Sequence, residues 1–568
     1  MTRRNSSDET YGSLKLPSIT DSMLEIYGGD KITFPTFAES INFFHGLLSS
    51  PRLAYRSDHK NPYNLPDEYS WSPRYTLLQP LPGKLADDFN HTVLDKATAK
   101  WEDFKDISGI NALTMARFGR VDEPAKHEPA KHVVLLGQTP DATPTQKTIV
   151  AAFANFIAAC LEELGYNNVP VYVITWNMYE GVKGIKLESI TTTKTQSLAN
   201  ITKQFTDASG VSTALAKIDT AQGTRSFWLL KKGDTKASNQ GENLEYRYKS
   251  GTGMSRVEVA WPVDMPGIRK MISYTRESLG ILLENADGRI AKMSQAHHED
   301  REEFQEIMQI KAKSERALAE LMQVEANTIK QKQELQTRKG GFVMWSPPID
   351  EHPRTGCVID MAISMSYEST HSTDALENYI ILGDKFSEQD IYRGLNCNNA
   401  NPTAFKYPIG GKLVFKTAVT PISRLMSGTQ VNENGERDTP VLKDGVTTSI
   451  TMGRLSPVWG ERPIQMPDGS TKFTKELIIF PVIKKHEPFS GQGDSGSAIV
   501  HCINDEAELV GIITGGSGYN KDTDVTWATP AEVLQEEWTS QGYYLPGKSE
   551  GKCRGATKLG NHALMFTL

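Results

Sequence analysis

Two continuous runs of apolar residues, 132–137 and 169–174, flank a stretch with a helical pattern in the first half of the chain. Apolar runs without alternation are typical of strands that are buried on both faces. Between them, residues 145–165 place apolar side chains on one helical face, and Gly165 provides a helix stop. A strand, a helix and a second strand within about 45 residues predict a βαβ unit with a parallel pair of strands.

The βαβ unit belongs to a predicted α/β domain over residues 66–265, whose role the sequence leaves open. The segment after its first strand has no glycine-rich phosphate loop, so a nucleotide site is not expected. Pro262 and Pro266 break regular structure and favour a domain boundary near that point. Residues 1–65 mix polar turns with short apolar pieces and stay unassigned.

Residues 299–338 have a different composition from the rest of the chain. They are dense in Glu, Gln, Lys, Arg and Ala, they contain no Gly or Pro, and their apolar side chains recur at roughly helical spacing. The pattern predicts a helix of about forty residues that ends at Gly340 and Gly341. Two interpretations stay open: a surface helix packed on a domain edge, or an intermolecular coiled coil that binds a protein partner. The N-terminal domain is a second candidate for such binding.

From residue 341 to about residue 538, short β-type runs alternate with turn signals such as Asp468-Gly469. This spacing predicts an antiparallel barrel or sandwich. Residues 546–568 form a polar, glycine-rich C-terminal tail. The chain is therefore expected to be multidomain, with an α/β N-terminal domain, a long helical insertion at 299–338 and an all-β domain.

The composition fits a soluble globular protein of more than one domain, since 38% of the 568 residues are hydrophobic and 23% are charged. The net charge of −7 argues against a nucleic-acid-binding protein. The five cysteines are far apart and lack zinc spacing, so neither a disulfide framework nor a metal site is expected. No apolar run approaches a membrane span, and no signal-peptide core follows the N-terminus. The protein is expected to be intracellular, in the cytoplasm, without membrane binding.

Residues 490–499 have the sequence Ser-Gly-Gln-Gly-Asp-Ser-Gly-Ser-Ala-Ile and place Ser495 between glycines, just before an apolar run. A serine hydroxyl becomes an effective nucleophile when a general base takes its proton and peptide N–H groups stabilise the oxyanion. Gly493 and Gly496 let the backbone fold tightly around the serine and bring such donors close. The alternative interpretation is a turn without a chemical role.

This string resembles the Gly-Asp-Ser-Gly-Gly nucleophile motif of trypsin-like serine proteases, with Ser497 in place of the last glycine. The resemblance implies a double-barrel domain over about residues 270–545. It makes Ser495 the nucleophile and the N–H groups of Gly493 and Ser495 the oxyanion hole. The layout resembles intracellular fungal trypsin-like proteins with an extra N-terminal domain, and it implies no metal ion or organic cofactor.

Two upstream motifs supply the other members of the triad that the resemblance implies, in the chain order His, Asp, Ser. The sequence Met-Ser-Gln-Ala-His that ends at His297 resembles the motif of the general base, which follows an apolar strand in that family. Asp360 lies in an apolar run and resembles the aspartate that orients the histidine and stabilises its charged form. The alternatives are a solvated His297 at a helix start and an Asp360 that faces water.

Further matches lie around the nucleophile motif. Residues 443–453 are similar to a Lys-x-Gly-x-Thr-Thr stretch of microbial trypsin-like enzymes, and residues 510–516 resemble the strand that pairs with the substrate backbone. The resemblance assigns a substrate-binding role to four residues: Phe489, Thr514, Gly515 and Gly516.

The expected function is a serine endopeptidase that cleaves a protein or peptide substrate through an acyl-enzyme. The alternative is a catalytically inactive protease-fold module used for protein binding or regulation.

Overall fold

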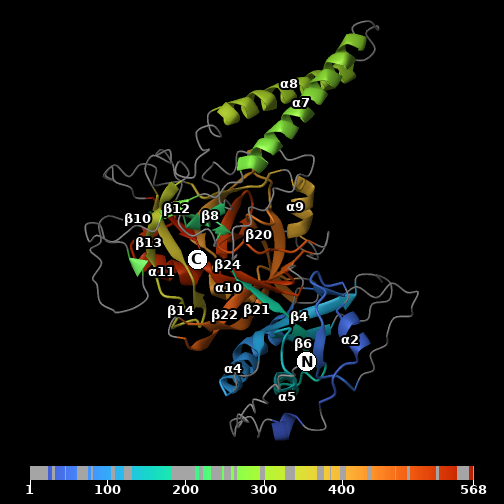
Figure 1. Cartoon of the computed structure of the whole chain (residues 1–568), viewed down its shortest axis with the longest axis vertical. Helices are drawn as coiled ribbons and strands as arrows, with labels where there is room; N and C mark the ends of the chain where they lie inside the picture. The colour runs from blue at the N-terminus through green and yellow to red at the C-terminus, as the bar shows by residue number, and fades with distance from the viewer. Residues whose placement is uncertain are drawn as a thin grey trace, which may run out of the picture.

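A computed structural model gives the fold of the chain, in which a β-rich body carries a blue-to-cyan N-terminal part on one side and a projecting helical hairpin (Figure 1). The residues that the structure describes are 24–28, 32–44, 46–60, 75–78, 81–103, 109–120, 131–180, 212–215, 222–224, 226–231, 246–247, 258–260, 265–293, 301–326, 339–366, 377–383, 385–396, 405–431, 436–466, 469–482, 487–519, 523–546 and 562–566.

Six strands among the described residues close a ring in the C-terminal half. Each is hydrogen-bonded to the next in the order β20, β21, β22, β25, β24, β23 and back to β20. Their apolar side chains form much of the main core, where Leu442, Leu455, Leu477, Ile499 and Leu509 have no exposed surface. The ring strands are β20 (Glu436–Lys443), β21 (Thr451–Gln465), β22 (Thr471–Pro481), β23 (Ala498–Ile503), β24 (Glu506–Gly518) and β25 (Val525–Pro530).

Short elements surround this ring. Strand β18 pairs with β17 and, in parallel, with β24, while β19 pairs with β20. The surrounding elements are β17 (Tyr379–Ile381), α9 (Glu388–Leu395), the 3-10 turn Ile409–Gly411, β18 (Lys412–Val419), α10 (Ile422–Ser427), β19 (Gln430–Val431) and α11 (Ala531–Ser540).

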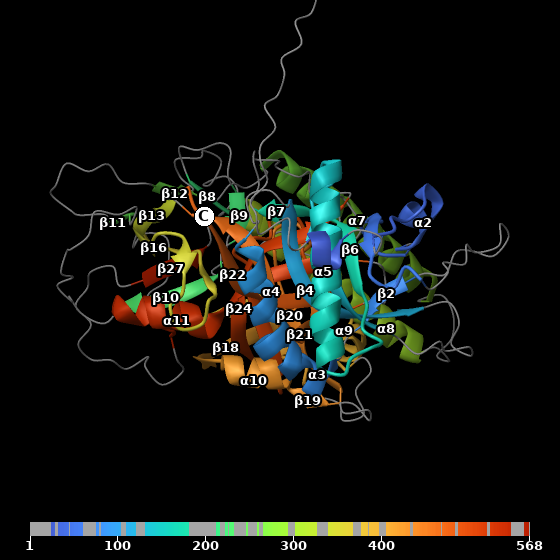
Figure 2. The same ribbon diagram turned by 90° about the horizontal axis from the view of Figure 1, so that it is seen from below.

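The predicted βαβ unit is confirmed in the N-terminal part. Strands β5 (Lys131–Gln138) and β6 (Val171–Thr175) are parallel neighbours, and helix α5 (Pro144–Glu163) joins them. Thr143 and Gln146 form a capping box at the start of α5. Gly165 follows the helix with a φ of +88°, a conformation that glycine adopts without strain. Figure 2 shows α5 lying along this part of the sheet.

The remaining N-terminal elements extend the same sheet or cover it. Strand β4 pairs with β2 and β5, and β1 pairs with β6. These elements are α2 (Phe37–Asn42), β1 (Leu53–Arg56), β2 (Tyr75–Leu78), β3 (Leu81–Pro82), α3 (Gly83–Asp88), the π-helical turn Phe89–Val93, α4 (Leu94–Trp101), β4 (Ile110–Arg120) and β7 (Asn177–Glu180).

The N-terminal sheet continues into the ring, because Leu113 of β4 pairs with Glu461 of β21. A second apolar cluster includes side chains from both parts, among them Val133 and Tyr172 with Phe480 and Trp527. One sheet therefore joins strands on both sides of the predicted boundary near residue 265.

A second sheet lies on the other side of the ring and draws on distant segments. Its order is β26-β10-β27-β16-β13-β12-β8-β9, and β11 pairs with β13. Strand β27, which lies in the predicted C-terminal tail, is inserted between β10 and β16. The strands are β8 (Ser212–Leu215), β9 (Gln222–Thr224), β10 (Phe227–Lys231), β11 (Tyr246–Arg247), β12 (Glu258–Ala260), β13 (Lys339–Ser346), β16 (Ala362–Ser366), β26 (Tyr543–Tyr544) and β27 (His562–Phe566); β14 (Asp350–Glu351) pairs separately with β15 (Val358–Ile359).

The structure has one helix within the predicted insertion at 299–338 and a second helix before it, where none was predicted. Helix α7 (Met265–Met293) packs against α8 (Arg301–Val324), and ion pairs join Arg276 to Glu325 and Lys311 to Asp287. The hairpin projects from the body, with the end of α7 and the start of α8 at its far tip (Figure 1). None of the helices that the structure describes combines the length and apolarity that a membrane crossing requires.

Glu461 is a buried carboxyl at the seam between the N-terminal sheet and the ring. Only 2% of its surface is exposed, and it accepts a hydrogen bond from Thr98 of α4. Burial raises its pKa to about 7, and the hydrogen bond from Thr98 offsets only part of this effect. The carboxyl therefore binds a proton more tightly in the folded protein than in the unfolded chain.

We expect the seam to weaken as pH rises. A carboxyl whose pKa is raised on folding contributes stability at low pH that is lost between its unfolded pKa, about 4.3, and its folded pKa, a loss of up to about 4 kcal/mol. Glu461→Gln, which stays neutral, should have a higher apparent Tm than the wild type at pH 8. The two proteins should differ little at pH 4.5. An equal difference at both pH values would contradict the seam account.

Candidate functional site

Ser495 lies in a tight turn that leads into β23. The peptide N–H of Asp494 donates to the carbonyl of Gly491 at 3.0 Å and closes the turn. Gly493 and Gly496, on either side of the serine, have φ angles of +104° and +84°. A residue with a Cβ atom adopts such φ angles only with strain, whereas glycine adopts them freely. The backbone conformation therefore explains why glycine occupies both positions.

Asp494 anchors this turn through a carboxylate with no exposed surface. It accepts hydrogen bonds from Lys443 Nζ (2.9 Å), Thr448 Oγ1 (2.7 Å) and the peptide N–H groups of Gly491 (3.0 Å) and Thr447 (2.8 Å). Lys443 is also fully buried, so the ion pair is shielded from water. Burial raises the pKa of Asp494, but the Lys443 ammonium and the hydrogen bonds outweigh burial and hold it below its usual range. The carboxylate stays ionised and ties the turn to Lys443 and the two threonines.

The turn packs against the edge of β24. Ser495 is 9% exposed, and its Oγ donates to the carbonyl of Thr514 at 3.5 Å. One residue on, the Gly496 N–H donates to the carbonyl of Ile513 at 2.8 Å. The serine hydroxyl thus lies where β23 ends its pairing with β24, within reach of a molecule on that edge.

The side chain of Thr514 belongs to a buried polar group. Its hydroxyl donates to Glu476, which also forms an ion pair with Arg462. All three side chains are at least 95% buried. This group fixes the Thr514 side chain, while the Thr514 carbonyl contacts Ser495.

The second sheet reaches the turn through Ser226, whose hydroxyl donates to the carbonyl of Gly496. The next residue, Phe227, starts β10 and pairs with Met565 of β27, which in turn pairs with Ile363 of β16. Neighbouring strands are about 4.8 Å apart, so Ile363 lies roughly 10 Å from β10 across the sheet.

Asp360 is three residues before Ile363, at the junction of β15 and β16, and it is half-buried. The backbone beside it is fixed on both sides. The carbonyl of Val358 accepts from Thr529 Oγ1 at 3.0 Å, and the carbonyl of Met361 accepts from Ser346 Oγ at 3.0 Å. Asp360 therefore lies in a segment whose backbone is fixed by hydrogen bonds. This segment is at the same end of the second sheet as Ser226, which precedes β10.

His297 lies outside the described residues. The chain before it is helical up to Met293, whereas the resemblance implied an apolar strand. The adjoining ends of α7 and α8 lie at the far tip of the hairpin (Figure 1). The role of His297 as general base stays a prediction.

Two buried histidines in the described part have partners away from the Ser495 turn. His352 Nε2 lies 3.3 Å from a carboxylate oxygen of Glu536, and its Nδ1 lies 3.0 Å from Thr355 Oγ1. His501 Nδ1 lies 2.8 Å from the carbonyl of Pro440, and burial lowers the pKa of this imidazole.

The predicted substrate-binding residues fall into two places. Phe489 is 1% exposed in the main core, and its carbonyl accepts from Thr451 Oγ1 at 2.6 Å. Gly515 and Gly516 lie on β24 directly after Thr514. Both glycines pair with β25 on one side and with β7 on the other.

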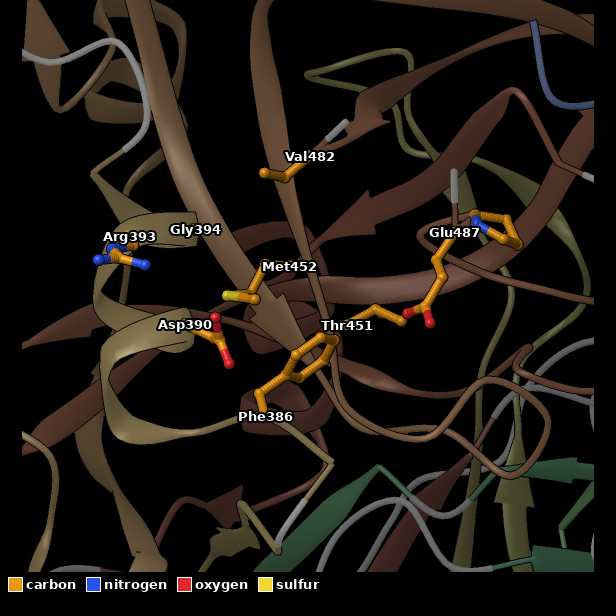
Figure 3. Close-up of a pocket in the computed structure, with 9 residues that line it drawn as sticks. Phe386, Asp390, Arg393, Gly394, Thr451, Met452, Val482 and Glu487 are labelled. Atoms are coloured by element: carbon orange, nitrogen blue, oxygen red, sulfur yellow. The ribbon is translucent and has the colours of Figure 1, made fainter. Parts of the chain in front are cut away.

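A pocket lies beside the loop that leads to Ser490, between α9 and the strands β21 and β22 (Figure 3). Phe386, Met452 and Val482 supply apolar lining, while Arg393 and Glu487 add opposite charges. Ser495 does not line this pocket. In the described part of the chain, no group of three or more His, Cys, Asp or Glu side chains is placed to hold a metal ion.

Three parts of this site were not assigned from the sequence. Lys443 had a signal, since it begins the stretch that resembles microbial trypsin-like enzymes. Glu476 had a weaker one, as a charged residue directly before the apolar run 477–480. Ser226 had none, because its contact with Gly496 joins segments 270 positions apart.

The Lys443–Asp494 pair should be essential to the stability of the site. Lys443→Met leaves the Asp494 carboxylate buried without its cation, which typically costs about 3–5 kcal/mol. Lys472→Met is the matched control, because Lys472 pairs with Asp350 at the surface, where such pairs contribute about 0–1 kcal/mol. Urea unfolding of both variants measures the two losses. Equal losses would show that the buried pair has no special role.

No protein-family model and no curated protein sequence matches this chain. Among solved structures, the chain is similar to a glutamic-acid-specific serine protease described as using a histidine triad in substrate binding. The identity is 13% and the TM-score 0.18, over 36% of this chain and 74% of that chain. A likeness of this strength carries no argument about the activity of this chain.

Proposed function

We propose that the chain is a serine endopeptidase with a trypsin-like double-barrel domain and Ser495 as its nucleophile. The main support for this proposal is the turn around Ser495. A buried ion pair and two glycines with positive φ hold the serine against a strand edge. Burying an ion pair is costly because both charges lose their hydration, and a turn with only a structural role does not require such a pair. A nucleophile does require a backbone that is fixed before the substrate binds.

In the proposed reaction, Ser495 Oγ attacks the scissile carbonyl while a general base takes the hydroxyl proton. His297 is the base that the resemblance implies, and this role requires it to lie beside Ser495, whereas the adjoining ends of α7 and α8 lie at the far tip of the hairpin (Figure 1). The N–H groups of Gly493 and Ser495 stabilise the oxyanion. The carbon–nitrogen bond then breaks, and the imidazolium gives its proton to the leaving amine. The base then takes a proton from water, which attacks the ester carbonyl of the acyl-enzyme. Cleavage of this ester releases the carboxylic acid product and restores the Ser495 hydroxyl. Asp360 orients His297 and stabilises its charged form.

A second candidate is a protease-fold module that binds protein segments without cleaving them. The observation that favours it is the position of α7 and α8. The predicted base, His297, lies between these helices in the sequence, and their adjoining ends lie far from the body (Figure 1). Without a general base, Ser495 would remain a weak nucleophile. Reactivity of Ser495 distinguishes the two candidates.

Ser495 should react with a fluorophosphonate probe, and Ser495→Ala should remove both labelling and peptide hydrolysis. Loss of a triad serine typically lowers turnover by about a million-fold. Ser497→Ala is the matched control, because Ser497 lies in the same turn and is also buried. Labelling of the wild type and of Ser497→Ala alone supports the endopeptidase. Hydrolysis that survives in Ser495→Ala rules it out, and absence of labelling in the wild type favours the binding module.

The two other triad members should have graded effects. Asp360→Asn favours the wrong imidazole tautomer and should slow acylation by about 10,000-fold. His297→Ala should slow it at least as much, because it removes the base. Asp350→Asn and His298→Ala are controls from the same segments, and Asp350 is exposed. Single-turnover acylation rates measure the four variants. A normal rate in His297→Ala would exclude His297 as the base.

A further inference from the structure

We infer that β7 is an intramolecular ligand that occupies the edge of β24 at Gly515–Gly518 and thereby blocks the strand to which the resemblance assigns pairing with the substrate backbone. This inference deepens the proposed function and rests on it for the identity of the external ligand, which is the substrate chain itself. An external peptide can pair with this edge only after β7 leaves it.

Ser495 and β7 share one edge of β24. Strand β25 pairs with residues 511–517 of β24, so it covers the opposite edge. On the remaining edge, β23 pairs with residues 506–512, and β7 pairs with residues 515–518. Ser495 contacts the carbonyl of Thr514, between these two pairings. A strand in the place of β7 therefore lies next to the serine hydroxyl.

Strand β7 runs in the direction that a substrate would need. Asn177 pairs with Gly518, and Glu180 pairs with Gly515, in antiparallel register. Strand β7 thus runs toward the Ser495 end of β24. A substrate that pairs in the same direction would bring its following peptide bond toward the nucleophile.

Hydrogen bonds to buried groups hold β7 in place. Trp176, directly before β7, has no exposed surface, and its indole N–H donates to Asp524 at 3.1 Å. Asn111 donates to the Trp176 carbonyl at 2.7 Å. Within the strand, Met178 is opposite Ser517, whose hydroxyl donates to the Met178 sulfur at 3.0 Å. The anchor keeps β7 at a high effective concentration beside the edge.

The residues of the β24 edge determine which kind of ligand fits it. Gly515, Gly516 and Gly518 present backbone with no side chains, so recognition depends mainly on main-chain hydrogen bonds, as in strand addition to other sheet edges. An added side chain at Gly516 would lie 2.6 Å from Thr523 Cγ2, which keeps the strand bare on that face. The site fits an extended chain with an unbranched, polarisable side chain such as methionine opposite Ser517.

The test measures binding of a fluorescent peptide with the sequence of residues 174–180 to the full chain by anisotropy. Every protein carries Ser495→Ala, so the outcome does not depend on hydrolysis. Tyr179→Pro removes a peptide N–H from β7 and should weaken its pairing, while Tyr179→Ala keeps that N–H as the control. Met178→Cys/Ser517→Cys places two cysteines opposite each other and should lock β7 when oxidised.

We expect the Tyr179→Pro protein to bind the peptide at least tenfold more tightly than the Tyr179→Ala protein. The oxidised cysteine variant should bind the peptide at least tenfold more weakly than the same protein after reduction. If Tyr179→Pro fails to fold, this comparison alone tests the inference. Equal affinities before and after reduction would overturn the inference. A different result is that peptide binding depends on whether β7 is displaced while Ser495 of the parent protein does not react with the fluorophosphonate. That combination would reject the endopeptidase but would support the strand-binding site at the β24 edge.

Discussion

Asp494 and Lys443 form an ion pair without solvent exposure at the base of the turn that carries Ser495. Hydrogen bonds from Thr448 and the peptide N–H groups of Gly491 and Thr447 satisfy the same carboxylate. The loss of either partner would leave a buried charge, so the turn has little freedom to relax. The contact of Ser495 with β24 depends on this arrangement.

The N-terminal part belongs to this site as much as to its own sheet. It joins the ring at the Leu113–Glu461 pair and shares an apolar cluster with β22 and β25. It also supplies β7, which covers the edge next to Ser495. A part of the chain whose role could not be read from its motifs thus contributes the strand that, in our proposal, competes with a substrate. Any change that loosens the seam would be expected to act on access to the nucleophile.

Local signals in the sequence predicted local structure well. The apolar runs around residues 145–165 gave the βαβ unit, because strand and helix periods are properties of neighbouring residues. The glycines around Ser495 predicted a tight turn, which the positive φ angles confirm. The short β runs of the C-terminal half predicted antiparallel strands, and six of them close the ring.

Pairings between distant segments could not be predicted in this way. Nothing in the four residues of β7 indicates β24 as a partner, since main-chain hydrogen bonds are the same for every sequence. Strand β27 lies in a polar, glycine-rich tail, yet it is inserted into the second sheet. Helix α7 contains Gly280 and Gly288, which weaken the helical signal. His297 lies outside the described residues, and the catalytic triad as a whole remains a prediction.

The most direct test compares two reagents on Ser495 in the Tyr179→Pro and Tyr179→Ala proteins. A small fluorophosphonate needs only the reactive hydroxyl, whereas a peptidyl phosphonate with the side chains of β7 also needs the β24 edge. If β7 and a substrate compete for one edge beside one nucleophile, the peptidyl reagent should label Tyr179→Pro at least tenfold faster than Tyr179→Ala. The small reagent should label both proteins at the same rate. Equal behaviour of the two reagents, or no labelling of Ser495 by either, would contradict the account.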